Sequence, residues 1–516
     1  MIQEPPENGP RKYSLKLLNN TVYNLLGALW GLVLSLVTTP YIVRGLGEDL
    51  FGLFSIVMVV MGYFTLLDVG LGTAAIKFLA EPRRLEDKTE ASRILGTVQA
   101  SNIVLGLAGA MTMYLGAGFI SDRVLSLPDG LHAAAVSAFR VCSAIFFINL
   151  IFSLYWAIPQ ALQRFDVLAR MRVPVFTVQT LGMVAVLHLG YSLIPLLYFY
   201  GIVTLMSLFY YYGVSRRLLP RGYSLLPRFD AEMFRKLFSF GLYASISRIS
   251  TILVFQLDRI LIAVFLSVSD VSFYVVPAML AGYIQRIPAL LAPVILPSAS
   301  ELDAEGRRDR LERLYTDGVK YSCLVSLPIF VVVAVLSREI LDIWIGPEFS
   351  RRGAGALALL SLGSFLISLN TIPAMIIVGI GRVEIYSIFT VGTGVISTTF
   401  CLLLIPRYGI LGAAIAFLIS SLFVVPALHL FINIKFKLGG VKIISGNLVR
   451  MGAAGGADFF VLLKMKHMVT GFQDFLVVSV IGFTIFYAGT VVLKVVTRNE
   501  WELLILYLKK VFGHKR

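Results

Sequence analysis

Two arginines deep inside apolar stretches are the residues of this sequence most able to do chemistry. Arg248 lies about 18 Å into the apolar stretch at 237–265, at 1.5 Å per helical residue. Arg286 lies about halfway along the next stretch, at 271–298, and is followed by Pro288, which can open a helix backbone. An arginine at the centre of a membrane helix costs about 2.5–3.5 kcal/mol on insertion scales. Each guanidinium therefore needs an anionic partner, either a protein carboxylate or a ligand.

One carboxylate also lies inside an apolar stretch. Asp68 belongs to the stretch at 51–80, where it could bind a coupling proton or cation, or could neutralise an arginine. Lys77 lies nine residues further on, on the opposite helix face, and its long side chain is expected to reach the cytoplasmic interface. Arg140 and Lys320 are weaker candidates for a cavity lining.

No pattern of catalytic, metal-binding or cofactor-binding residues stands out. Gly70-Leu-Gly72 is a fragment of a dinucleotide fingerprint that follows no strand, so we expect these glycines to loosen the helix or to allow close packing. Cys142, Cys323 and Cys401 lie in apolar stretches without disulfide or metal-ligand spacing, and they are expected to be packing residues. The sequence predicts no enzyme, no catalytic residue, no cofactor and no metal.

The composition indicates what kind of elements must position these residues. Of 516 residues, 57% are hydrophobic and only 15% are charged, whereas a soluble domain has about 25% charged residues. Apolar stretches of about 20 residues suit membrane-spanning helices, because helices satisfy their own backbone groups in lipid. We predict an all-α integral membrane protein with about 14 spans, near 17–43, 51–80, 92–119, 131–158, 171–190, 192–214, 237–265, 271–298, 316–337, 354–379, 385–405, 410–433, 443–463 and 473–494.

The basic residues predict the orientation of these spans. Most of the 45 Lys and Arg residues fall in the N-terminus, in every second loop and in the C-terminus. Because cytoplasmic loops carry the excess of Lys and Arg, both termini are expected in the cytoplasm of a cell (inner or plasma) membrane protein. The net charge of +15 is therefore a topology signal. It requires no nucleic acid, and it favours contact with anionic membrane lipids.

The chain also contains a sparse internal repeat. A shift of 220 residues places Gly62-Tyr63 on Gly282-Tyr283 and Glu81 on Glu301. Repeated halves are common in secondary transporters, whose substrate site lies between the halves. The expected organisation is a cytoplasmic tail (1–16), an N-terminal six-helix lobe (17–214), a cytoplasmic linker (215–236), a C-terminal six-helix lobe (237–433), two additional transmembrane helices (434–494) and a basic cytoplasmic tail (495–516).

Several short motifs, in their order and spacing, carry a resemblance to a known family. In the first half they are Tyr41–Gly47, Phe51–Ser55 and Leu67–Ala75; in the second half they are Phe238–Gly241, Leu257–Ile262, Leu296–Ser300, Ile343–Phe349, Gly379–Arg382 and Tyr408–Ala416. With these motifs the chain resembles the polysaccharide flippases of the multidrug/oligosaccharidyl-lipid/polysaccharide (MOP) exporter superfamily, which is MATE-like. The resemblance implies two six-helix lobes around a central cavity, alternating access, and undecaprenyl-pyrophosphate-linked oligosaccharides as substrates.

The resemblance also implies roles for the candidate residues. The seventh and eighth spans line the cavity in this family, so Arg248 and Arg286 are expected to bind the substrate pyrophosphate. Asn20 and Asn24 lie four residues apart on one helix face and could contact sugar or hold helices together. Arg259 belongs to an Asp-Arg pair that matches the family and could act at an outward gate. The coupling ion at Asp68 would be a proton or sodium.

We therefore expect a flippase for lipid-linked sugar in cell-surface polysaccharide biosynthesis, such as O-antigen or exopolysaccharide export. Possible partners are a polysaccharide polymerase and glycosyltransferases. One alternative is a cation-coupled multidrug antiporter of the same superfamily, whose cavity would favour carboxylates. A lipid II flippase is another, because extra spans can serve a lipid tail. A membrane enzyme is disfavoured, because the longest outer loop, at about 338–353, is too short to form a soluble domain.

Overall fold

The computed structural model describes residues 10–81, 87–128, 130–220, 222–290, 292–438 and 441–496, with the side chains of 10–26, 165, 243–255, 292–294 and 441–445 outside the description. The regular elements of these residues are helices, as predicted. They are α1 (Pro10–Phe64), η1 (Thr65–Asp68), α2 (Leu71–Ala80), α4 (Lys88–Phe119), η2 (Ile120–Val124), α5 (His132–Ala161), α6 (Phe165–His188), α7 (Leu193–Leu218), α8 (Ala231–Phe265), α9 (Val268–Ala289), α10 (Ala292–Ala304), α11 (Arg308–Val335), α12 (Ser337–Trp344), α13 (Pro347–Gly379), α14 (Val383–Tyr408), α15 (Ile410–Phe436), α16 (Val441–Met465), η3 (Lys466–Met468) and α17 (Phe472–Val492).

Ten helices in the described part of the chain are long and apolar enough to cross a membrane. The first of them, Gly27–Asp68, has 42 residues, which at 1.5 Å per residue is about 63 Å, or twice the apolar thickness of a bilayer. Gly47 kinks this helix with a φ of 73°, between the two spans that the sequence predicts there. The multi-pass, all-α class is therefore confirmed, while the number of 14 spans stays a prediction.

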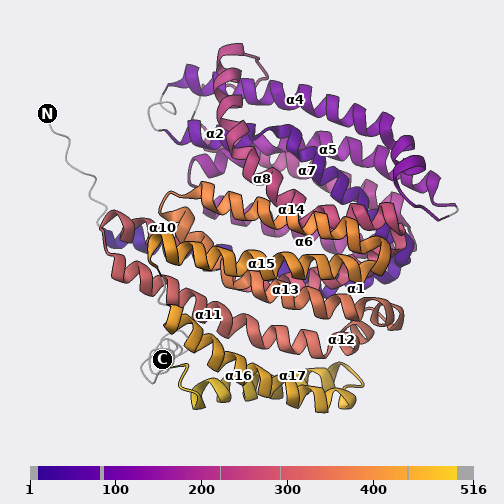
Figure 1. Ribbon diagram of the computed structural model, residues 1–516. Helices are drawn as coiled ribbons and strands as arrows, with labels where there is room; N and C mark the ends of the chain where they lie inside the picture. Colours follow the sequence, from indigo (N-terminus) through magenta and orange to yellow (C-terminus); the bar gives the residue numbers. More distant parts are fainter. Residues whose placement is uncertain are drawn as a thin grey trace, which may run out of the picture. The chain divides into compact units, whose positions relative to one another are not determined.

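The chain divides into two compact units, Met1–Ser272 and Phe273–Arg516. In the first unit α4 packs along α5, α5 packs on α7, and α1 packs on α6 (Figure 1). In the second unit α13 contacts α11 and α15, α14 pairs with α15, and α16 and α17 form a pair beside α11 (Figure 1). The three cysteines are free and buried, which confirms that they are packing residues.

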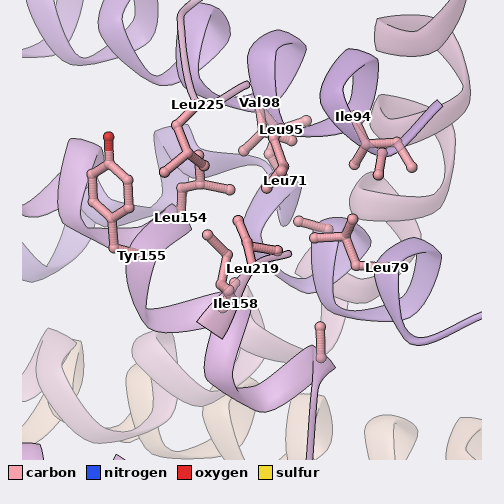
Figure 2. Close-up of a cluster of buried hydrophobic side chains, with 14 of the residues drawn as sticks. Leu71, Leu79, Ile94, Leu95, Val98, Leu154, Tyr155, Ile158, Leu219 and Leu225 are labelled. Carbon is pink, nitrogen blue, oxygen red and sulfur yellow. The ribbon is translucent and has the colours of Figure 1, made fainter. Parts of the chain in front are cut away.

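The core of the first unit lies where α2, α4, α5 and the segment after α7 meet. Figure 2 shows the buried side chains that converge there. The labelled residues are Leu71, Leu79, Ile94, Leu95, Val98, Leu154, Tyr155, Ile158, Leu219 and Leu225. Because side chains from all four segments pack together in this cluster, it fixes α2 and α5 against each other. These two helices carry the polar site described below.

The segment between α7 and α8 is attached to the start of α4. The Arg228 backbone N–H donates to Gly96 O at 3.1 Å, and a side chain at Gly96 would lie 3.0 Å from Leu226 O. The Arg93 guanidinium pairs with Asp230 at 2.8 Å, and the same carboxylate accepts the Met233 N–H at 2.9 Å, which caps α8. These contacts hold the described non-helical part of the predicted linker, residues 219–220 and 222–230, on the first unit.

Candidate functional site

The second predicted span is interrupted in its middle. Helix α1 ends at Phe64, one 3₁₀ turn follows, and Val69 and Gly70 adopt left-handed backbone conformations with φ of 46° and 70° before α2 begins. A left-handed conformation is costly for a β-branched residue such as Val69. Strain of this kind persists only where surrounding packing enforces it, and it concentrates at functional sites. The expectation that Gly70 loosens this helix is confirmed.

Helix α8 covers this break at close range. A Cβ atom at Gly241 would lie 2.4 Å from Val69 O and 3.0 Å from Gly70 C, so only glycine lets the two backbones approach. About two turns further along α2, Lys77 Nζ lies 4.1 Å from the centre of the Phe240 ring. Lys77 therefore makes a cation–π contact with α8, which the sequence analysis did not foresee.

A polar cavity of about 440 Å³ lies beside the break, inside the first unit. One wall is η1 and the first turns of α2, and the other wall is a single face of α5. The polar residues that line it are Thr65, Asp68, Thr73, Asn149, Ser153 and Gln160. A volume of this size falls within the range of small-molecule sites.

Asp68 is the charged residue of this cavity, and its side chain is only 5% exposed. A Cβ atom at Gly72 would lie 3.5 Å from Asp68 Oδ2, which places the carboxylate over the first turn of α2. The free N–H groups of a helix start favour a negative charge there. The coupling role of Asp68 stays a prediction.

The α5 wall is held in place by α4. Asn102 is fully buried, and its Nδ2 donates to Leu150 O and to Ser153 Oγ, both at 3.0 Å. Gly109 of α4 allows close packing, because a Cβ atom there would lie 2.6 Å from the Phe146 ring. The polar side chains of α5 therefore project from a helix whose position is fixed on its other faces by packing.

The other predicted site residues of the first unit have different surroundings. Arg259 is half-buried near the end of α8, where its backbone N–H donates to Asp258 Oδ1 at 2.8 Å. Its Nε is buried and has no hydrogen-bond partner among the described residues, and the same holds for the hydroxyl of Tyr63. Tyr63 lies within electrostatic range of both Asp258 and Arg259. The side chains of Arg248, Asn20 and Asn24 lie outside the described residues.

In the second unit, Arg286 lies close to another helix break. Its guanidinium is exposed and lies 5.4 Å from the centre of the Tyr283 ring. Helix α9 ends at Ala289 and α10 begins at Ala292, so the predicted eighth span is two helices. The expectation that Pro288 opens this helix is confirmed. The break follows the break at Val69–Gly70 by about the 220 residues of the predicted repeat.

The two weaker candidates lie outside the cavity. Arg140 is exposed on α5, with its guanidinium 5.1 Å from the Tyr114 ring centre. Lys320 is buried on α11 and lines a small space of about 30 Å³ together with Asp317 and Asn447. This space is large enough for a water molecule or two but not for a sugar.

Sequence reasoning missed the α5 wall of the cavity. Asn149, Ser153, Trp156 and Gln160 are spaced by four, three and four residues, which places them on one helix face. That spacing was the available signal. It was overlooked because neutral polar residues cost far less in a membrane helix than the charges on which the site prediction depended.

Comparisons with known proteins agree with this fold. A family model described as "Polysaccharide biosynthesis protein" matches residues 17–303. The chain is 23% identical over 415 residues to the "Putative O-antigen transporter" of Shigella flexneri, with 78% of this chain and 94% of that protein covered.

Two solved structures share the architecture. One is a "Lipid II flippase MurJ, inward closed conformation", with a TM-score of 0.71, 14% identity, and coverage of 91% of this chain and 98% of that chain. The other is an inward-facing "multidrug resistance MATE family transporter of the MOP superfamily", with a TM-score of 0.66, 15% identity, and coverage of 81% and 96%. At these identities the likeness concerns the fold.

Proposed function

Because the chain belongs to the polysaccharide biosynthesis protein family of the MOP exporter superfamily, we propose that it is a flippase for lipid-linked oligosaccharide. It would move undecaprenyl-pyrophosphate-linked sugar from the cytoplasmic to the outer face of the cell membrane, by alternating access. The observation that carries the proposal is the family match, which extends over both helix-break regions of residues 17–303. The similarity to an O-antigen transporter over 94% of its length supports it.

The geometry supplies what such a substrate needs. A sugar headgroup is polar and cannot cross lipid unaided, and the cavity beside Asp68 offers hydroxyl and amide groups inside an apolar helix bundle. In this proposal Arg248 and Arg286 bind the diphosphate, while Arg259 acts near the outer end of α8. Asn20 and Asn24 contribute further polar groups. The protein then performs no bond chemistry and acts as a transporter.

Asp68 is the proposed coupling residue. Binding of a proton or sodium ion would neutralise a carboxylate that is 5% exposed and that lies beside a broken helix. Discontinuous helices in secondary transporters commonly carry their ion and substrate sites. Both termini are proposed to be cytoplasmic, on the basis of the distribution of Lys and Arg.

One observation favours a second candidate, a cation-coupled multidrug antiporter. The described residues that line the cavity include a carboxylate and no Lys, Arg or His, which suits a cationic substrate. The two functions separate in cells from which the gene has been deleted. A flippase predicts that lipid-linked oligosaccharide accumulates on the cytoplasmic leaflet and that surface glycan is lost, both reversed by the restored gene. Normal surface glycan together with a new sensitivity to cationic dyes would support the antiporter instead.

A further inference from the structure

The face of α5 that lines the cavity combines an aromatic ring with amide and hydroxyl groups. Trp156 lies between Ser153 and Gln160 along this face, and Asn149 lies one turn before Ser153. The Trp156 ring is a flat apolar surface, and the Asn149, Ser153 and Gln160 side chains place hydrogen-bonding groups before and after it along the helix. A ligand that fits must therefore carry polar groups around its rim and an apolar face.

The hydrogen-bonding capacity of this row is partly unused. Asn149 makes no side-chain hydrogen bond to any described residue, so its carbonyl and its amide are available to a ligand. Gln160 Nε2 donates to Trp156 O at 3.3 Å, which leaves its Oε1 available as an acceptor. Ser153 receives the Asn102 amide and donates to Leu150 O at 2.8 Å, so it can only accept further bonds.

The Trp156 side chain is held in place by contacts with two other aromatic rings. Its ring lies 6.1 Å from Phe152 and 5.6 Å from Tyr211, centre to centre, in tilted arrangements. The core residues Leu154 and Ile158 belong to the opposite side of α5, where Figure 2 shows them beside Leu219 and Leu225 in the packed cluster. A surface that is already ordered loses little entropy on binding, which favours affinity.

The groups of the lining indicate which part of a substrate fits here. The described lining residues offer amide and hydroxyl groups beside an indole ring. An uncharged polyhydroxyl ring matches these groups, because its hydroxyls both donate and accept hydrogen bonds. The C–H face of a pyranose packs on an aromatic ring, because the ring face carries partial negative charge. The rim hydroxyls then reach Asn149, Gln160 and Ser153.

We propose that this cavity binds a saccharide unit of the lipid-linked substrate, stacked on Trp156 and hydrogen-bonded by Asn149 and Gln160. This inference rests on the proposed flippase function. It assigns the two parts of the substrate to different residues. The arginines of α8 and α9 bind the diphosphate, and the α5 face of the first unit binds the glycan. Affinity for the glycan would then depend on α5, independently of the arginines.

Direct binding tests this assignment. The probes are the lipid-linked oligosaccharide fraction extracted from the source cells, the undecaprenyl pyrophosphate left after mild acid removes the glycan, and the released glycan itself. Binding to the full chain is measured by isothermal titration in lipid nanodiscs. The wild-type chain should bind the intact substrate more tightly than undecaprenyl pyrophosphate. Trp156→Ala should reduce this preference about three- to tenfold, the worth of one aromatic contact.

Asn149→Leu keeps the side-chain volume and removes the amide, so it should reduce the preference about two- to tenfold without opening a hole. Trp30→Ala is the matched control, because Trp30 belongs to the same unit, bonds to Thr177 Oγ1 at 2.8 Å and does not line the cavity. Melting temperatures recorded alongside identify any unfolded variant. The Trp30 variant should keep the full preference for the intact substrate.

Three outcomes would contradict either the saccharide site or the flippase function. If both α5 variants keep the full preference for the intact substrate, the saccharide site is wrong and the flippase proposal stands. If the wild-type chain binds neither lipid, the flippase proposal fails as well. If the released glycan binds as tightly as the intact substrate and depends on Trp156, the cavity takes free sugar instead of a lipid-linked one. Tethering by the lipid should otherwise make the intact substrate the tighter ligand.

Discussion

Ser269 donates a hydrogen bond to the carboxylate of Asp49, and the two residues are separated by the 220 positions that relate the two halves of the sequence. Both lie in the first unit, at the start of the second span of each repeat. Ser272 Oγ donates to Glu48 O in the same place. Two segments that the predicted repeat makes equivalent therefore contact each other within the first unit.

Gly52 is the position on which this contact depends. A Cβ atom there would lie 2.0 Å from Val268 O, so Gly52→Ala must separate α1 from the start of α9 or distort both. Overpacking of this kind costs about 1–3 kcal/mol, and the melting temperature of the purified protein should fall accordingly. Gly118→Ala is the control, because nothing lies within 4 Å of a Cβ atom at that position. Equal melting temperatures for the two variants would contradict the close approach.

The capping carboxylate of α8 gives a prediction about pH. The Met233 N–H and the Arg93 guanidinium lower the pKa of Asp230 below its ordinary value. Because the pKa is lower in the folded protein than in the unfolded chain, the carboxylate stabilises the fold above its unfolded pKa, and this stabilisation is lost as the pH falls through its folded pKa. Asp230→Asn should therefore melt below the wild-type protein at pH 7, and the two should converge in acid.

Thermal melting between pH 7 and pH 2 measures this difference, and Asp303→Asn serves as the control because Asp303 is exposed. The control should follow the wild-type curve throughout. A constant gap between Asp230→Asn and the wild-type protein over the whole range would show that the ionised form of Asp230 has no part in stability.

Asp68→Asn keeps the size of the side chain and removes its charge. If Asp68 binds the coupling ion, the variant should insert normally, reach wild-type levels and lose transport that depends on a pH or sodium gradient. Asp122→Asn provides the comparison, because Asp122 is an exposed carboxylate bonded to His132. Transport by Asp68→Asn that matches the wild type across pH and sodium would end the coupling proposal, whereas failed insertion would favour a structural role.

The stability of alanine variants distinguishes the two possible partners of Arg248 and Arg286, which are the substrate diphosphate and a protein carboxylate. If substrate is their partner, Arg248→Ala and Arg286→Ala should leave expression and melting temperature unchanged or improved while export fails. Lysine at either position should restore export in part, because it keeps the charge and loses the two-pronged hydrogen bonding. If a protein carboxylate is the partner, alanine would strand that group and typically cost about 3–5 kcal/mol of stability. Arg217→Ala, at an exposed position of α7, provides the control.

Some parts of this structure follow from the sequence and others do not. Apolar length predicts the helical, multi-pass class, and the cost of burying charge drew attention to Asp68. Pro288 marks the break after α9, since proline disrupts helix hydrogen bonding. Gly70 indicates that the second span is loosened there, but the left-handed conformation of Val69 has no local signal, because valine disfavours it. Contact with α8 at Gly241 stabilises it, and that contact is tertiary. The α5 row escaped notice because Asn149 and Gln160 are neutral.

Transport by the purified protein is the most direct test of the central claim. The chain is reconstituted into sealed proteoliposomes that hold fluorescent lipid-linked oligosaccharide in both leaflets, and a membrane-impermeant reductant is added outside. The proposed function predicts that the protected inner-leaflet fraction, about half of the signal, becomes accessible with the wild-type chain and stays protected with the Arg248→Ala, Arg286→Ala double variant. Continued protection with a folded wild-type chain, at every pH and sodium gradient applied, would contradict the account.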